Sequence, residues 1–166
     1  MRQAAIGLIA SLFLASCVSV DAPRMALPTE TISVQTAAGP HAFQVEIAAD
    51  RETQARGLMY RREMAPDAGM LFDLHQSEQI SFWMKNTYLP LDMVFIRADG
   101  TVSSVEPNAI PLSTASIPSQ EPVRAVLEIN GGRAHQLGIE PGDRVLSAIF
   151  NSQTAANTGG SRTAAR

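Results

Sequence analysis

Apolar and polar residues alternate in two short runs near the start of the central part of the chain. Residues 31–36 place isoleucine and valine between polar side chains, and residues 43–47 repeat the same alternation. Alternation with a period of two is typical of a strand that buries one face. Gly39 and Pro40 interrupt the pattern between the runs, so the sequence predicts an opening β-hairpin.

The next segment repeats with the period of a helix. Apolar residues recur at Ala55, Leu58 and Met59, which would lie on one side of a helix. Asp50 precedes them and belongs to a residue type that commonly begins helices. The segment therefore predicts one short helix over about residues 50–61.

Strand-like runs return after this helix. Short apolar runs occupy residues 70–74, 80–85, 91–98, 101–106, 123–129 and 143–150, and a helical turn is expected at residues 133–137. Asp99 and Gly100 separate two of the runs and predict a two-residue type I′ hairpin turn. Both faces of residues 91–96 are apolar, as in a sandwich or a closed barrel. We therefore expect a mainly β, antiparallel domain of about eight short strands.

The two ends of the chain differ from this middle part. Residues 1–16 carry one early positive charge and then an apolar stretch, which is the layout of a signal peptide. Residues 14–17 read LASC, which resembles a lipobox, so Cys17 is the predicted site of lipid attachment. Residues 17–29 are expected to form a lipidated tether and residues 30–150 a single domain. Residues 151–166 lack bulky apolar side chains and are expected to be a disordered tail.

These features predict an exported protein that a lipid anchors to a membrane. Val18 follows Cys17, in place of an aspartate that would resemble an inner-membrane retention signal. The expected location is therefore the outer membrane, facing the periplasm. Cys17 is the only cysteine, so no disulfide is expected, and the net charge of −3 without a basic cluster argues against nucleic acid as a partner.

Motifs for covalent or metal chemistry do not occur in the sequence. It contains no G-x-S-x-G turn for a serine nucleophile, and the domain has no cysteine. Its methionines and histidines lack the spacing of a metal site. We therefore expect no catalytic residue, no metal and no cofactor. One alternative stays open, in which Asp92 and Glu128, two acids on predicted strands, act together in an enzyme that cleaves envelope polysaccharide.

The polar group Lys85, Asn86 and Thr87 is the candidate binding site that the residue types suggest. The three side chains supply a positive charge, an amide and a hydroxyl at the end of a predicted strand. Trp83, beside them, offers a flat apolar surface. The alternative is structural, with Lys85 paired to an acid and its two neighbours shaping the turn before Pro90.

Five stretches of the chain resemble one protein family. They are RGLMYR, GMLFDL, FWMKNTYLPLDMVFI, VLEINGG and GIEPGD, at residues 56–61, 69–74, 82–96, 126–132 and 138–143. In order and spacing they resemble domain of unknown function 192. The resemblance implies a compact, jelly-roll-like β-sandwich and no established activity. The positions that match the family's motifs are Arg56, Gly57, Trp83, Lys85, Asn86, Thr87, Asp92, Glu128 and Asp143.

The hypothesis that combines these features is a non-catalytic binding module on an exported lipoprotein. Its ligand would be a glycan or another polar or anionic molecule of the cell envelope. The candidate ligand-binding residues are Arg56, Trp83, Lys85, Asn86, Thr87, Asp92 and Glu128. A structural or protein-interaction module without a small-molecule site is the first alternative.

Overall fold

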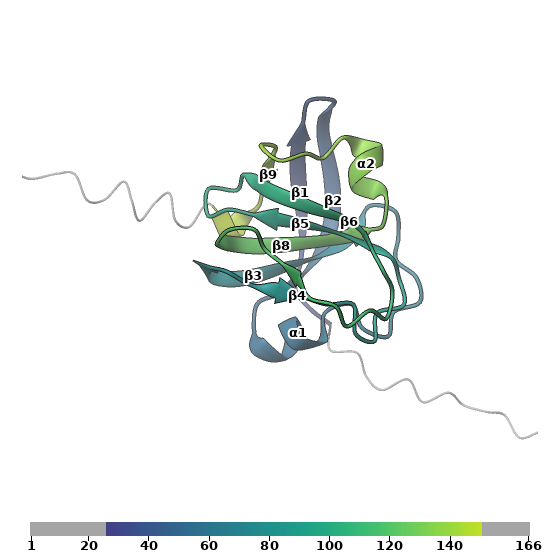
Figure 1. Ribbon diagram of the computed structural model, residues 1–166. Coiled ribbons are helices and arrows are strands. Elements are labelled where there is room, and N and C mark those ends of the chain that lie inside the picture. The colour runs from purple at the N-terminus through teal and green to yellow at the C-terminus, as the bar shows by residue number, and fades with distance from the viewer. Residues whose placement is uncertain (1–25, 151–166) are drawn as a thin grey trace, which may run out of the picture.

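The computed structural model describes residues 26–150 (Figure 1). The strands are β1 Thr29–Thr36, β2 Gly39–Ala48, β3 Ala68–Glu78, β4 Ser81–Phe82, β5 Leu91–Ile96, β6 Val102–Ala109, β7 Ile117–Pro118, β8 Val123–Asn130 and β9 Arg144–Leu146. The helices are α1 Arg51–Arg56 and α2 Arg133–Leu137, and residues 148–150 form a further helical turn. None of the helices in this part of the chain is long and apolar enough to cross a membrane.

The predicted signal peptide, Cys17 and the predicted tail lie outside the described residues. Only the last part of the predicted tether is described, and it is joined to the domain. The Pro28 carbonyl accepts a hydrogen bond from the Ile47 amide at 2.8 Å, and β1 begins at the next residue, Thr29. The side chain of Leu27 packs against the hydrophobic core. The domain therefore begins a few residues before position 30.

Seven strands form one sheet in the order β6-β5-β8-β3-β2-β1-β9, and β4 pairs with β7 in a small second sheet. The large sheet curls into a half-barrel, so that β1 and β2 run across the direction of β5, β6 and β8 (Figure 1). A bridge between Thr101 and Arg144 brings the two edges of the sheet together at one point. The Gly100 carbonyl accepts from the Val145 amide there at 2.8 Å. A Cβ on Gly100 would lie 2.8 Å from the Val145 carbonyl oxygen, which explains the glycine at this close approach.

The mainly β class is confirmed, but the arrangement of strands differs from the expectation. The strands form one curled sheet with a small second sheet, and a sandwich or jelly roll is not confirmed. The expectation of purely antiparallel pairing was wrong, because β2 and β3 pair in parallel, with Val45 opposite Gly69. Parallel neighbours need a crossover connection, which α1 and the loop after it provide.

The predicted helix begins where expected and ends early. The Asp50 side chain accepts hydrogen bonds from the amides of Glu52 and Thr53, each at 2.9 Å, and so caps the first turn. The helix ends at Arg56 because Gly57 adopts a φ of 48°. A Cβ on Gly57 would also press on the Phe72 ring at 3.2 Å. The glycine therefore ends the helix and lets it approach the sheet.

The predicted turn between β5 and β6 is longer than two residues. Only Gly100 has a positive φ, 86°, whereas a type I′ turn needs a positive φ at both central residues. The Gly100 amide donates to the Arg97 carbonyl at 3.0 Å, and the Asp99 carboxylate accepts from the Thr101 amide at 2.9 Å. The Asp99 side chain therefore stabilises a turn that ends in a glycine with a positive φ.

The two faces of the curled sheet carry two separate hydrophobic clusters. One contains Ala125, Leu127 and Ile129 of β8, and the other contains Val126 of the same strand. β8 is thus buried on both faces, between β3 and β5. The second cluster includes Leu58, just after α1, and Phe82 of β4 packs against it. α1 and β4 lie at the end of the molecule away from α2 and β9 (Figure 1).

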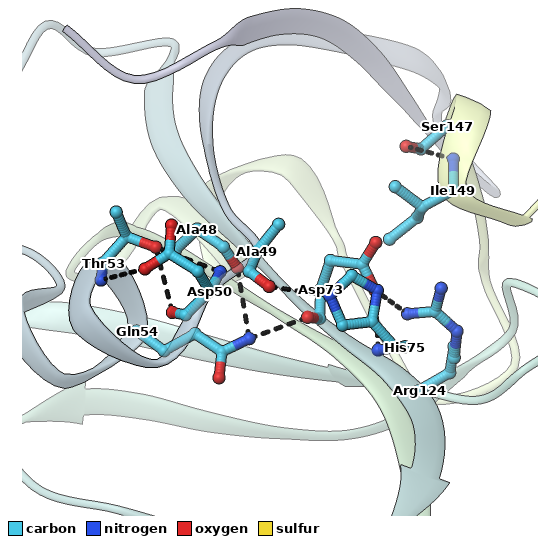
Figure 2. Close-up of polar contacts among 10 residues, drawn as sticks. All are labelled: Ala48, Ala49, Asp50, Thr53, Gln54, Asp73, His75, Arg124, Ser147 and Ile149. Carbon is cyan, nitrogen blue, oxygen red and sulfur yellow. Dashed lines mark hydrogen bonds and ion pairs between the residues drawn. The ribbon is translucent and has the colours of Figure 1, made fainter.

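A polar network holds α1 against β3 (Figure 2). The carboxylate of Asp73 forms an ion pair with Arg124 of β8, in which both side chains are buried. The Asp73 carbonyl accepts from Gln54 of α1 at 2.7 Å, and a ring nitrogen of His75 lies 2.7 Å from the Ala49 carbonyl just before the helix. The position of α1 is therefore linked to the buried ion pair.

Replacement of Arg124 by alanine tests this link. The change leaves the Asp73 carboxylate buried without its cation, so we expect the free energy of unfolding to fall by about 3 kcal/mol. Arg133→Ala, which removes a surface ion pair with Asp67, should have a much smaller effect. Urea denaturation of the two variants measures the difference. Equal losses would show that the Asp73–Arg124 pair has no special role.

Candidate functional site

A cleft with a volume of about 240 Å³ opens between α1, the segment after it, β4 and one face of the large sheet. Its lining residues are Gln54, Ala55, Arg56, Gly57, Leu58, Met59, Phe72, Leu74, Ile80, Ser81, Phe82, Trp83, Thr87 and Glu128. Most of them are apolar. The cleft is therefore suited to a small molecule with an apolar body.

Aromatic packing forms one wall of the cleft. Phe82 of β4 meets Phe72 of β3 edge to face, with ring centroids 5.0 Å apart, and meets Phe95 of β5 at 6.4 Å. Edge-to-face contacts of this kind fix the relative position of the rings. The short strand β4 is therefore held against the large sheet, and Trp83, directly after it, stands at the cleft with half of its surface exposed.

Two polar side chains of the lining are almost completely buried. Thr87 and Glu128 are each 5% exposed, and they come from segments 41 positions apart in the sequence. The Thr87 hydroxyl makes only a long hydrogen bond, 3.3 Å, to the Lys85 carbonyl. Arg56, at the end of α1, is exposed and makes no ion pair with any described residue. The site thus combines a buried hydroxyl, a buried carboxyl and an unpaired cation.

Glu128 lies in a row of side chains that crosses the sheet. It is directly opposite Met70 of β3 and Met93 of β5, and Met70 is in turn opposite Glu46 of β2. Residues directly opposite each other on neighbouring strands project from the same face. The Glu128 carboxyl therefore lies between two methionines that are fully buried.

Burial controls the protonation of Glu128. Removal from water raises the pKa of its carboxyl to about 8, and the positive charge of Arg61 lowers that pKa only in part. Arg61 is itself engaged in a two-pronged ion pair with Glu46, at 2.5 and 2.6 Å. Among residues 26–150, the Glu128 side chain has no hydrogen-bond partner. It is therefore mainly an uncharged carboxylic acid at neutral pH.

The Lys85, Asn86 and Thr87 group is divided by the fold. Thr87 lines the cleft, whereas Lys85 is exposed, with its Nζ atom 5.3 Å from the centre of the Trp83 ring. The Asn86 amide donates to the Tyr60 hydroxyl at 2.8 Å, and its φ is 58°. Asn86 therefore helps to shape the loop, and Lys85 lies over the Trp83 ring and outside the lining of the cleft.

Asp92 does not line the cleft. Its carboxylate is completely buried and accepts hydrogen bonds from the backbone amides of Asn108, Gly132 and Ala134, at 2.7–2.9 Å. These bonds join β5 to the end of β6 and to the start of α2. Asp143 is likewise outside the lining and accepts from the Glu140 amide at 2.8 Å. The carboxylates of Asp92 and Asp143 both accept hydrogen bonds from backbone amides.

Several lining residues were not singled out in the sequence. Gln54, Met59, Ser81 and Phe82 reach the cleft because α1 and β4 lie over the same face of the sheet. Their helical and strand periodicity predicts buried or surface positions, but not that the two elements meet. The described residues contain no cluster of three or more histidine, cysteine or acidic side chains that could hold a metal ion.

Comparison with known proteins identifies relatives over almost the whole described part. The model of the family DUF192, described as "Uncharacterized ACR", matches residues 32–147. A crystal structure of a "putative transcription regulator" from Sinorhizobium meliloti is 48% identical, with a TM-score of 0.74, over 76% of this chain and 99% of that chain. A protein of unknown function from Novosphingobium aromaticivorans is 40% identical, with a TM-score of 0.73, over 75% of this chain and 89% of that chain. None of the curated proteins compared with the chain matches it.

The raised pKa of Glu128 predicts a pH-dependent stability. Between pH 4.5, the ordinary value, and about 8, the folded state keeps the proton that the unfolded state loses. The contribution of Glu128 to the free energy of unfolding is therefore largest at low pH and falls by up to about 1.4 kcal/mol per pH unit through this window.

Glu128→Gln should remove this dependence, because glutamine does not ionise. Its stability relative to the natural chain should increase from pH 5 to pH 8 in urea denaturation. Glu106→Gln is the matched control, since Glu106 lies opposite Met93 in the same row but is exposed. An equal effect of pH on both variants, or a carbon-13 titration midpoint of Glu128 below pH 5, would contradict the assignment.

Proposed function

The chain belongs to the DUF192 family, and from the geometry of its cleft we propose that it is a non-catalytic module that binds a small ligand with an apolar body and a polar group. The observation that carries this proposal is the pair of buried polar side chains, Thr87 and Glu128, inside a mainly apolar cleft. Apolar clefts with a few convergent polar groups are the usual form of small-molecule sites.

The positions of the two candidate acids favour binding over polysaccharide cleavage. A glycosidase needs two carboxyl groups on either side of the bond that it breaks. Here Glu128 is the carboxyl of the cleft, and Asp92 is fully occupied by three backbone amides. A purely structural module accounts for Asp92 and Asn86, but it gives no partner to Glu128.

The charge of this chain does not favour DNA binding, although the Sinorhizobium relative is described as a "putative transcription regulator". Binding to DNA rests largely on contacts between basic side chains and phosphates. This chain has 13 basic and 16 acidic residues and a net charge of −3. A small-molecule ligand agrees better with that charge.

The cell envelope is the compartment in which we place this activity. The apolar stretch within residues 1–16 and the LASC motif that ends at Cys17 support export and lipid attachment. Val18 supports the outer membrane, facing the periplasm. The ligand would then be a molecule of the envelope, such as a sugar derivative whose ring lies on Trp83 while a polar substituent enters the cleft.

A fragment screen tests ligand binding at the cleft. Benzamide, benzoate and N-acetylglucosamine are suitable probes, and the fluorescence of Trp83, the only tryptophan, reports on their binding. Ser81→Phe should fill the cleft and weaken the binding of any probe at least tenfold, whereas Ser77→Phe, on an exposed residue outside the lining, should not. Equal binding by both variants, or no binding by the natural chain, would refute the proposal.

The membrane anchor has a separate test. In a bacterium with two membranes, the natural chain should be recovered in the outer-membrane fraction. Cys17→Ser should release it from that fraction, because the lipid attachment atom is lost. Val18→Asp should move it to the inner membrane. An unchanged distribution of Cys17→Ser would show that Cys17 carries no anchor.

A further inference from the structure

Glu128 differs from the other buried ionisable side chains of the described residues. There are four of these side chains, and three of them form an ion pair or hydrogen bonds within the protein. Asp73 and Arg124 form an ion pair, and Asp92 accepts three backbone hydrogen bonds. Glu128 has no hydrogen bond, although its side chain lines the cleft. Its carboxyl oxygens are open to the cleft and make no hydrogen bond with the described residues, so they can bond to a molecule that enters the cleft.

The neighbours of Glu128 do not provide that partner. Met70 and Met93 lie on either side of it in the sheet and have no strong donor or acceptor. Arg61, from the segment after α1, acts on it at a distance but is held by Glu46. The remaining polar groups of the lining are uncharged, except for Arg56. The free donor and acceptor of the carboxyl are therefore available to a molecule in the cleft.

The charges around the cleft disfavour a cationic ligand. The groups that face Glu128 or the cleft carry positive charge in Arg61 and Arg56, with the negative charge of Glu46 paired to Arg61. Lys85 adds a further cation over the ring of Trp83, which lines the cleft. A ligand cation that approached Glu128 would pass these groups and would also have to ionise a buried acid.

We infer that Glu128 meets the ligand as an uncharged carboxylic acid, and that the ligand presents a neutral donor beside an acceptor, as a carboxamide does. The inference rests on the proposed function of the cleft and names the polar group that the cleft recognises. One hydrogen bond runs from the Glu128 hydroxyl to the ligand carbonyl, and a second runs from the ligand N–H to the Glu128 carbonyl. The pKa of about 8 agrees with this role, because the acid stays protonated at neutral pH.

Three probes of similar shape separate the possible roles of Glu128. Benzamide has a neutral donor and acceptor, benzamidine replaces them by a cation, and toluene has neither. At pH 7 the natural chain should bind benzamide at least tenfold more tightly than it binds the other two. Above pH 8 the affinity for benzamide should fall about tenfold per pH unit, because ionised Glu128 loses its donor.

Two variants complete the experiment. Glu128→Gln keeps a donor and an acceptor at every pH, so it should bind benzamide without the loss above pH 8. Glu128→Met, which matches the neighbours of Glu128, should bind benzamide no more tightly than it binds toluene. Trp83 fluorescence and the shifts of amide signals around the cleft are the measurements.

Other results would overturn the inference in distinguishable ways. Tighter binding of benzamidine, increasing with pH, would show that Glu128 is the counter-ion of a cationic ligand. Equal binding of benzamide and toluene, unchanged in Glu128→Met, would show that Glu128 does not contact the ligand. In both cases the cleft remains a binding site. If no probe binds at the cleft, both the inference and the proposed function fail.

Discussion

The burial of β8 on both of its faces is the constraint on which the rest of the structure depends. The strand lies between β3 and β5 and takes part in both hydrophobic clusters of the curled sheet. Any charged side chain on it is therefore removed from water and needs a partner within the protein or from outside. β8 carries two such side chains, Arg124 and Glu128. Arg124 has a partner in the fold and supports the architecture, whereas Glu128 lines the candidate site.

Arg124 has an ionic partner within the fold, the buried carboxylate of Asp73. Its ion pair with Asp73 is linked to Gln54 and so to the position of α1 (Figure 2). Glu128, four residues further along, lines the cleft and has no hydrogen-bond partner among residues 26–150. One buried charge on β8 thus positions the helix that covers the cleft, and one buried acid faces the space beneath that helix. The position of α1 and the polar group of the cleft therefore both depend on β8.

The segment FWMKNTYLPLD illustrates how one motif divides its residues among several roles. Phe82 packs into the core, and Trp83 and Thr87 line the cleft. Asn86 holds the Tyr60 loop, and Asp92 joins β5 to the start of α2. Lys85 lies over the Trp83 ring. The eleven residues of this motif therefore contribute to the core, the loops and the cleft.

Local patterns in the sequence were sufficient for the mainly β class, the opening hairpin, the Asp50 cap and the family. Each of these depends on residues close together in the chain or on a characteristic motif. The parallel pairing of β2 with β3, the curl of the sheet and the end of α1 at Gly57 depend on contacts between distant segments. The same holds for the site. Residue types suggested Thr87 and Glu128 as candidates, but Asp92 was an equal candidate until its backbone partners were known. Only the tertiary structure showed that Thr87 and Glu128 line the cleft and that Asp92 does not. The burial and the hydrogen-bond partners of a side chain are set by the strands and loops that surround it.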